Sequence, residues 1–363
     1  MSDLYEYKCL NCGGALEFDT ETQKLKCPFC DSEFDVEALK AMDETLKTTD
    51  GADQMDNWQT NADNQWVDGE TDGLNTYVCK SCGGEIVGDE NTAATSCPFC
   101  GNPVVVAGKF SGALKPDFVI PFKLDKKAAK EKLKAYVSSK KFAPSTFKSK
   151  NRLEEIKGIY VPFWLFDSNI NAAVQYEGTR VRKWRDSNYD YTETSFFDVY
   201  RQGNMSFSNI PVDGSTKMPD DLMESIEPFD FREAVDFQTA YLAGYLADKY
   251  DVDMQSSIPR ANERVKSSAI DTLGSTAQGY VSLTPKSSNV QLLSGVSKYA
   301  LFPVWILNTE YKGEKYTFAM NGQTGKFIGN LPVDNGKLAA LFTGVAVGVT
   351  AAVFFLGRLF GLL

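Results

Sequence analysis

The sequence predicts a multi-domain membrane protein with two small metal-binding ribbons, a duplicated α+β domain and one C-terminal transmembrane helix. Three observations predict it: a cysteine pattern that occurs twice, a proline–tryptophan motif that occurs twice, and an uncharged run near the C-terminus. The predicted segments are ribbon one at 1–40, an acidic flexible linker at 41–76, ribbon two at 77–107, the α+β domain at 108–331, a tether at 332–337 and the membrane helix at 338–357.

All eight cysteines lie in two copies of one pattern, 70 residues apart. Each copy is a Cys-x-x-Cys-Gly-Gly motif followed by Cys-Pro-Phe-Cys. Two such pairs aim four sulfurs at one point, which is the closed tetrahedral site of structural zinc. We therefore expect two zinc ions, although the same thiolate geometry also accepts iron in a rubredoxin-like site. The predicted ligands are Cys9, Cys12, Cys27 and Cys30 in ribbon one, and Cys79, Cys82, Cys97 and Cys100 in ribbon two.

Each site is expected to stabilise a small fold rather than to perform catalysis. A ribbon of ~35 residues buries too little apolar surface to be stable alone, so metal binding supplies its folding energy. A catalytic zinc keeps an open position, and its ligands commonly include histidine, which this chain does not contain. The sequence also carries no Walker A loop and no Gly-x-Ser-x-Gly elbow, so we expect no enzyme activity.

The run 338–357 contains no charged residue and is bounded by Lys337 and Arg358. As a helix it would be about 30 Å long, the hydrocarbon thickness of a bilayer, and a buried core helix is the alternative. We expect a tail anchor with the bulk of the protein in the cytoplasm, because the N-terminus has no apolar run and thiolate ligands favour a reducing compartment. Gly344 and Gly348 permit oligomerisation through close helix approach, although glycine is common in membrane helices anyway.

Charge is distributed unevenly along this chain of net charge −10. The linker has nine acidic residues and one lysine, and its Trp58 and Trp66 could anchor a partner or dock on the chain itself. Residues 109–157 reverse the balance, with 14 basic against 5 acidic residues. They include a helix predicted over Asp125–Lys140, capped by Asp125. Its exposed lysines would face anionic lipid headgroups or only solvent; they include Lys126, Lys127, Lys130 and Lys134.

A weaker repeat predicts the duplicated α+β domain. Tyr160-Val-Pro-Phe-Trp-Leu-Phe is similar to Leu301-Phe-Pro-Val-Trp-Ile-Leu, and each follows a helical pattern and leads into β-type sequence. The proline inside each strand predicts an edge or a bulge, and the tryptophans are expected in the core. Further helices are expected near 220–226 and 234–250.

Longer strings carry a family resemblance, among them Lys115-Pro-Asp-Phe-Val-Ile-Pro-Phe-Lys and Tyr241-Leu-Ala-Gly-Tyr-Leu-Ala-Asp. With the two cysteine units, they make the chain resemble a family of bacterial membrane proteins with two N-terminal zinc ribbons. These proteins look like transcription-factor-IIB-type ribbon proteins and are sometimes labelled primosomal-helicase-like. The resemblance implies zinc at all eight cysteines. It also implies a role beside phage-shock-A-like and band-7-like proteins, as a membrane docking platform.

The sequence thus predicts a non-catalytic adaptor that docks cytoplasmic proteins at the membrane, in a setting such as the envelope-stress response. The alternative is a nucleic-acid-binding ribbon protein. The ribbons argue against it because both are acidic, with four lysines against nine carboxylates in 1–40 and one against three in 77–107. An iron-loaded electron carrier is a further alternative.

Overall fold

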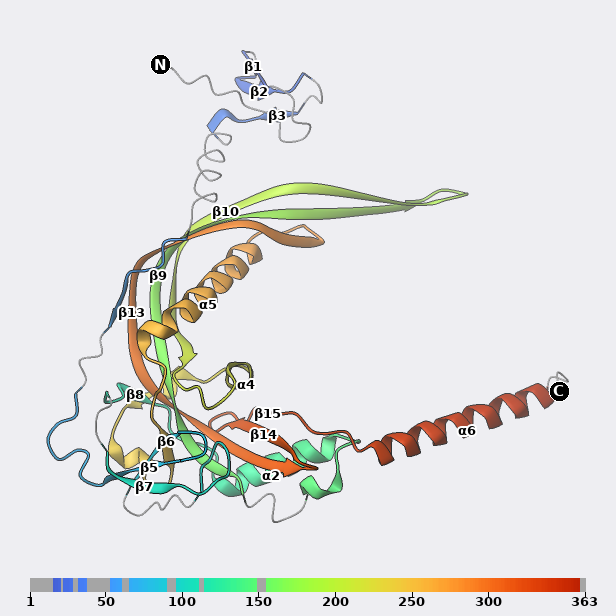
Figure 1. Ribbon diagram of the computed structural model, residues 1–363. Helices are drawn as coiled ribbons and strands as arrows, with labels where there is room; N and C mark the ends of the chain where they lie inside the picture. Colours follow the sequence, from blue (N-terminus) through green and yellow to red (C-terminus); the bar gives the residue numbers. More distant parts are fainter. Residues whose placement is uncertain are drawn as a thin grey trace. The chain divides into compact units, whose positions relative to one another are not determined.

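The computed structural model describes most of the chain (Figure 1). Three predicted metal ligands, Cys9, Cys12 and Cys30, and much of the predicted linker lie outside the described residues. Those residues are 16–20, 22–28, 32–37, 53–60, 65–89, 96–110, 114–148 and 155–359. The chain forms two compact units, the first from Met1–Gln59, Phe166–Ile210 and Ile258–Val296, the second from Thr60–Leu165, Pro211–Ser257 and Ser297–Leu363.

A small antiparallel sheet of the order β1-β2-β3 lies in the N-terminal segment. β1 (Glu17–Asp19) pairs with β2 (Lys24–Lys26), which also pairs with β3 (Glu33–Phe34). The hairpin of β1 and β2 lies between the second and third cysteines of the first motif.

A twelve-stranded sheet has the order β11-β8-β13-β9-β12-β6-β5-β7; in addition β10 pairs with β9, β4 and β14 with β13, and β15 with β14. Its strands are β4 (Trp58–Thr60), β5 (Leu74–Val78), β6 (Glu85–Asp89), β7 (Val105–Lys109), β8 (Phe118–Val119), β9 (Lys157–Arg185), β10 (Asp190–Asp213), β11 (Val235–Asp236), β12 (Leu246–Asp248), β13 (Ser282–Tyr311), β14 (Glu314–Asn321) and β15 (Phe327–Gly329). The long strands β9, β10 and β13 continue from one unit into the other, so the unit boundaries cut through the predicted α+β domain.

In the described parts of the chain, the α-helices are α2 (Lys126–Ser139), α4 (Asp220–Ser225), α5 (Met254–Ser275) and α6 (Asn335–Leu359). There, 3₁₀ turns lie at Ser145–Lys148, Phe231–Glu233 and Thr239–Leu242. Asp125 caps α2 as predicted, because its side chain accepts a hydrogen bond from the Ala128 N–H at 2.7 Å. The buried face of α2 consists of Ala129, Leu133 and Val137. It packs against Trp305, Phe318 and Met320 in a core of the second unit.

The prediction of a helix near 234–250 is wrong. This segment instead contains β11, a 3₁₀ turn and β12. Gly244 has a φ of 79°, which interrupts any helix there. Beyond it, β12 is held by two neighbours at once, antiparallel to β6 and parallel to β9. Tertiary pairing therefore overrides the local helical pattern.

The chain contains two modules with the same order of elements. The first module runs from β8 through α2 and β9 to the turn after β10 (residues 118–217). The second runs from β12 through α5 and β13 to the turn after β14 (residues 246–326). Each short strand pairs in parallel with the long strand of the other module: β8 with β13, and β12 with β9. Each helix is capped by an aspartate, Asp125 in α2 and Asp253 in α5.

The loop after each short strand makes matching contacts in the two modules. The N–H groups of Asp251 and Val252 donate to the Gly214 carbonyl at 3.0 and 3.1 Å. The N–H groups of Lys123 and Leu124 donate to the Gly322 carbonyl at 3.2 and 3.0 Å. The indole N–H groups complete the match, Trp164 donating to the Val252 carbonyl at 2.9 Å and Trp305 to the Leu124 carbonyl at 3.0 Å. Both tryptophans are buried, as predicted.

The two motif prolines do not mark edge strands, because β9 and β13 lie in the interior of the strand order. Each proline lies just past the end of its short parallel neighbour, whose last paired residue is opposite Tyr160 in one module and Leu301 in the other. The missing N–H of proline therefore interrupts no pairing with that neighbour. The carbonyls of Pro162 and Pro303 accept hydrogen bonds from Gly214 and Gly322 at 2.9 and 2.8 Å.

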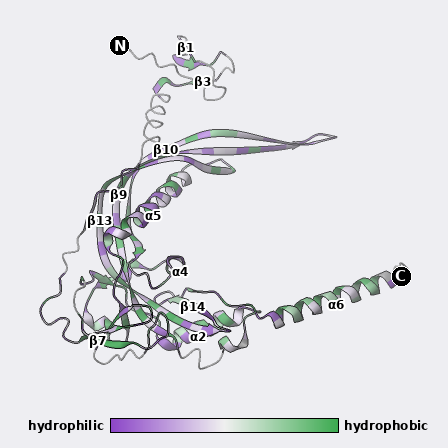
Figure 2. Cartoon of the chain, viewed as in Figure 1, coloured by the Kyte–Doolittle hydropathy of each residue, from purple (hydrophilic) through white to green (hydrophobic). Residues whose placement is uncertain are grey.

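Among the described residues, α6 is the helix long and apolar enough to cross a membrane, and none of its apolar window is buried in the protein. Figure 2 shows most of α6 in hydrophobic colours. The helix begins at Asn335, so the last three residues of the predicted tether are already helical.

Candidate metal centre

The side chains of Cys79, Cys82, Cys97 and Cys100 converge on one point in the second unit. Their four sulfur atoms all lie within 4.8 Å of one another. The Cys79–Cys100 and Cys82–Cys97 sulfur pairs are 3.5 and 3.6 Å apart. Ideal tetrahedral zinc, with Zn–S bonds of ~2.3 Å, requires a sulfur–sulfur spacing of about 3.8 Å, so the quartet fits a single metal ion.

Each Cys-x-x-Cys pair forms a tight turn closed by a backbone hydrogen bond. The Gly83 N–H donates to the Cys79 carbonyl at 2.8 Å, and the Gly101 N–H donates to the Cys97 carbonyl at 3.0 Å. Both glycines have positive φ angles, 72° and 77°, a region that glycine adopts without a Cβ clash. The glycine that follows each Cys-x-x-Cys pair therefore helps to orient the two sulfur atoms toward the metal site.

The sheet positions the two turns. β5 ends at Val78, directly before Cys79, and β6 begins at Glu85, so the first turn closes the β5–β6 hairpin. β6 also pairs with β12, with Val87 opposite Ala247. Cys79 and Cys97 belong to the same buried core cluster as Phe163 and Phe302 of the long strands. The cysteine cluster is therefore continuous with the core of the second unit.

Two residues that sequence reasoning missed support the cluster. The Asn102 amide donates to Ser81 Oγ at 2.8 Å and to Cys100 Sγ at 3.4 Å, which links the two turns. The Lys157 ammonium donates to the Ser96 carbonyl at 2.8 Å, just before Cys97. Asn102 follows the last cysteine by two residues and could have been noticed, whereas Lys157 is distant in sequence.

The thiols differ in how readily they ionise. Burial raises the pKa of Cys97 and of Cys82. Burial also acts to raise the pKa of Cys100, but hydrogen bonds, led by the Asn102 backbone N–H, lower it to about 7. A metal ion must therefore displace the protons of Cys82 and Cys97, and its binding should strengthen as the pH rises.

Of the first cysteine quartet, only Cys27 lies within the described residues. It is fully buried, and its N–H donates to the Ser32 carbonyl at 2.9 Å. The equivalent bond 70 residues later runs from Cys97 to Asn102 at 2.7 Å. The local backbone at Cys27 thus matches that of the second motif.

The other predicted site residues are not part of the cysteine cluster. Trp58 is buried, with its ring edge-on to Phe166 at 5.0 Å and its indole N–H donating to Asn262 at 2.8 Å. Trp66 lies edge-on to Phe110 at 5.4 Å. Both rings therefore pack on the chain itself. The remaining predicted residues lie on α2 and α6: Lys126, Lys127, Lys130, Lys134, Gly344 and Gly348.

The chain is similar along nearly its whole length to the uncharacterized protein YdjG of Bacillus subtilis (strain 168). The two are 36% identical over 358 residues, which cover 99% of each chain. The chain belongs to the YdjG family. The match is long enough to include both cysteine motifs and the start of α6. No family model and no solved structure matches the chain. In this member of the YdjG family, the four-cysteine cluster could hold one metal ion.

Proposed function

We propose that the protein is a non-catalytic, zinc-binding membrane adaptor that holds cytoplasmic partner proteins at the membrane. In this proposal both cysteine quartets bind zinc and form ribbons, and α6 is a single-pass anchor that leaves the rest of the chain in the cytoplasm. The two modules are the halves of a duplicated α+β domain. The partners belong to the class that the family resemblance implies, phage-shock-A-like or band-7-like proteins.

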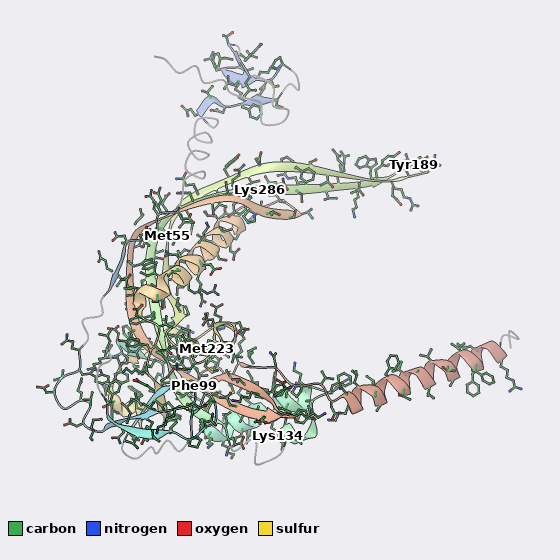
Figure 3. All side chains as sticks on the ribbon, in the orientation of Figure 1. Met55, Phe99, Lys134, Tyr189, Met223 and Lys286 are labelled. Atoms are coloured by element: carbon green, nitrogen blue, oxygen red, sulfur yellow. The ribbon has the colours of Figure 1, made fainter. Side chains whose placement is uncertain are left out.

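The observation that carries the adaptor role is an exposed aromatic arm in the first unit. The arm consists of residues 178–199 of β9, β10 and the turn between them, and Figure 3 labels Tyr189 at its end. Tyr189 and Phe196 are 65% and 66% exposed, and Trp184 is 44% exposed. Clustered large aromatic side chains in contact with water are typical of protein interaction sites.

The tip of the arm is ordered by its own hydrogen bonds. The Asp186 carboxylate accepts from the N–H groups of Asn188 and Tyr189, both at 2.8 Å, and from the Tyr191 hydroxyl at 2.9 Å. These bonds hold the pKa of Asp186 below its usual value. Trp184 stacks on Tyr191 with ring centroids 5.3 Å apart. A preformed aromatic surface of this kind loses little conformational entropy when a partner binds.

The charge of the arm favours a protein partner over a nucleic acid. Residues 178–199 contain four basic and four acidic side chains. A surface that follows a polyphosphate backbone needs an excess of positive charge. A closed four-sulfur metal site also leaves no open position for substrate, which supports a structural role for the metal.

Site-specific photo-cross-linking tests the docking role. A photoreactive amino acid at position 189, in cells that express the full chain, should yield discrete cross-linked proteins. The same group at Lys312, in the exposed turn between β13 and β14, should not. Trp184→Ser with Tyr191→Ser should weaken the cross-link by removing the stacked pair. Equal cross-linking at both positions would remove the arm from the proposal.

Metal content tests the zinc part separately. The purified full chain should hold two zinc ions, the Cys79→Ser variant one, and the Lys80→Gln variant two. Lys80 is the matched control because it is exposed and lies between Cys79 and Cys82. Iron with a reversible visible bleach would replace the zinc assignment with the electron-carrier alternative.

A further inference from the structure

A hollow of about 530 Å³ lies beside the start of α6, in the second unit. One wall is the C-terminal end of α2 and the loop that follows it, and the other is the segment that leads from β15 into α6. The residues that matter for its chemistry are Tyr136, Lys140, Lys141, Leu331 and Val333.

Three hydrogen bonds fasten the two walls together. The Tyr136 hydroxyl donates to the Gly329 carbonyl at 2.7 Å. The Asp334 N–H donates to the Phe142 carbonyl at 2.8 Å, and the Lys337 ammonium donates to the Ala143 carbonyl at 2.6 Å. The hollow is therefore preformed rather than opened by a ligand, and the first turn of α6 is bound directly to its rim.

Positive charge dominates this region. Residues 126–141 contain seven lysines and one glutamate. Lys140 lies over the Tyr136 ring, 5.1 Å from its centroid, and both Lys140 and Lys141 are exposed. Within the described part of the chain, neither lysine forms an ion pair. The nearby Asp334 carboxylate is engaged at the start of α6, where it accepts from the N–H groups of Gly336 and Lys337 at 3.0 and 3.2 Å.

The chain itself sets the depth of the hollow relative to a bilayer. Leu338, where the apolar run begins, lies three residues after Asn335, which is about 4.5 Å of helix rise. The headgroup layer on each side of a bilayer is roughly 5–8 Å thick. If α6 spans the membrane, the hollow lies at headgroup depth. Its wall also offers an apolar contact, because Val333 is 53% exposed.

We propose that this hollow binds the headgroup of an anionic phospholipid, with Lys140 and Lys141 pairing with its phosphodiester and Tyr136 and Val333 contacting its glycerol end. A lipid fits better than a soluble phosphate because the rim of the hollow is bound to the first turn of α6 and one wall includes the apolar Leu331, Pro332 and Val333. The site rests on the membrane anchorage in the proposed function, and on neither the metal nor the partner.

Native mass spectrometry of the purified full chain in a non-ionic detergent tests the site. With phosphatidylglycerol and phosphatidylcholine at equal concentration, the wild-type chain should retain phosphatidylglycerol preferentially. Lys140→Gln with Lys141→Gln should reduce this preference by about fivefold per lysine. Lys140→Arg with Lys141→Arg should retain it, which separates charge from folding effects. Tyr136→Phe should weaken binding without changing charge, because it releases one wall from Gly329.

The matched control is Lys126→Gln with Lys127→Gln, at the other end of the same helix. It changes the net charge by the same amount, so it should leave the preference intact. An equal loss in both double variants would assign the effect to diffuse attraction and overturn the site. Displacement of the lipid by millimolar glycerol phosphate would assign the hollow to a soluble anion and also overturn it. Recovery of the full chain in the soluble fraction of lysed cells would instead remove the anchorage itself.

Discussion

The two modules make the same backbone contacts but bury different side chains at one turn. This turn follows β10 in the first module and β14 in the second. In the second module the turn begins with Asn321, which is fully buried and fully bonded. Its amide donates to the carbonyls of Ile226 and Pro228 at 3.1 and 3.2 Å. Its side-chain oxygen accepts from the N–H groups of Gln323 and Thr324, both at 2.9 Å.

Buried acids lie at the corresponding turn of the first module. Asp213 occupies the position of Asn321, and its Oδ2 is buried with no hydrogen-bond partner among the described residues. Asp248 lies beside this turn on β12 of the second module, at the position that corresponds to Ile120 after β8 of the first module. It accepts from Ser215 Oγ at 2.5 Å, while its Oδ1 is buried and unpartnered there too. Burial raises the pKa of both acids, that of Asp248 to about 8.

The comparison separates the shared backbone hydrogen bonds from the side chains that are buried at the turns. The backbone hydrogen bonds and the two tryptophans are the same in both modules, whether the turn begins with an acid or with an amide. Buried acids with unpartnered oxygens cost stability, whereas the amide in the second module stabilises its turn. The acidic turn at Asp213 is therefore expected to lower the stability of the fold. Substitutions that exchange Asp213 and Asn321 for each other's residue type test this directly.

The largest effect is expected when the acid and the amide at the two turns are exchanged. Asn321→Asp should destabilise the protein by about 3–5 kcal/mol, because it removes two hydrogen bonds and places a carboxylate against two carbonyls. Asp213→Asn should stabilise it by about 1 kcal/mol at neutral pH or above. Urea unfolding in detergent, followed by tryptophan fluorescence, measures both. Destabilisation of the same size in both variants would show that the turns are not equivalent.

The next effect is a pH dependence that arises at the acidic turn. The folded state holds the Asp248 proton up to about pH 8, whereas the unfolded state releases it near pH 4. Stability should therefore fall as the pH rises through this window, by up to about 1.4 kcal/mol per pH unit for one group. Asp248→Asn should reduce this slope in metal-loaded protein, and the exposed Asp198→Asn should not. An unchanged slope in Asp248→Asn would assign the pH dependence to other groups.

A smaller difference is expected at the glycines that contact the two prolines. A Cβ at Gly322 would lie 2.7 Å from Phe122 and 2.9 Å from Pro303, whereas a Cβ at Gly214 would lie 3.3 Å from its nearest atom, the Pro162 carbonyl oxygen. Gly322→Ala should cost about 2–3 kcal/mol by overpacking, and Gly214→Ala about 1 kcal/mol or less. Thermal unfolding of the two variants side by side is the measurement. Equal losses would contradict the difference in packing.

The smallest difference is expected at the tryptophans, where the modules match. Trp164→Phe and Trp305→Phe each remove one indole N–H and leave a carbonyl without that donor. Each should cost about 1–3 kcal/mol, and the two values should agree within about 0.5 kcal/mol. A gap of several kcal/mol in urea unfolding would show that the shared hydrogen bond is not equally important in both modules.

The sequence alone predicted the features that depend on neighbours in the chain. The spacing of Cys79, Cys82, Cys97 and Cys100 predicted the quartet, because each Cys-x-x-Cys turn is a local structure. The Asp125 cap and the buried face of α2 followed from helical periodicity. The apolar run predicted a helix that can span a membrane, since length and composition decide that property.

Only the tertiary structure decided what depends on distant segments. Periodicity favoured a helix near 234–250, but pairing with β6 and β9 makes part of it a strand. The motif prolines predicted edge strands or bulges, but strand pairing places β9 and β13 in the interior of the sheet. The burial of Asp213 beside Asp248, the fastening of Lys337 to Ala143 and the exposure of the aromatic arm also have no local signal. They arise because strands from both modules cross and pair, and contacts between distant residues depend on the whole packed chain.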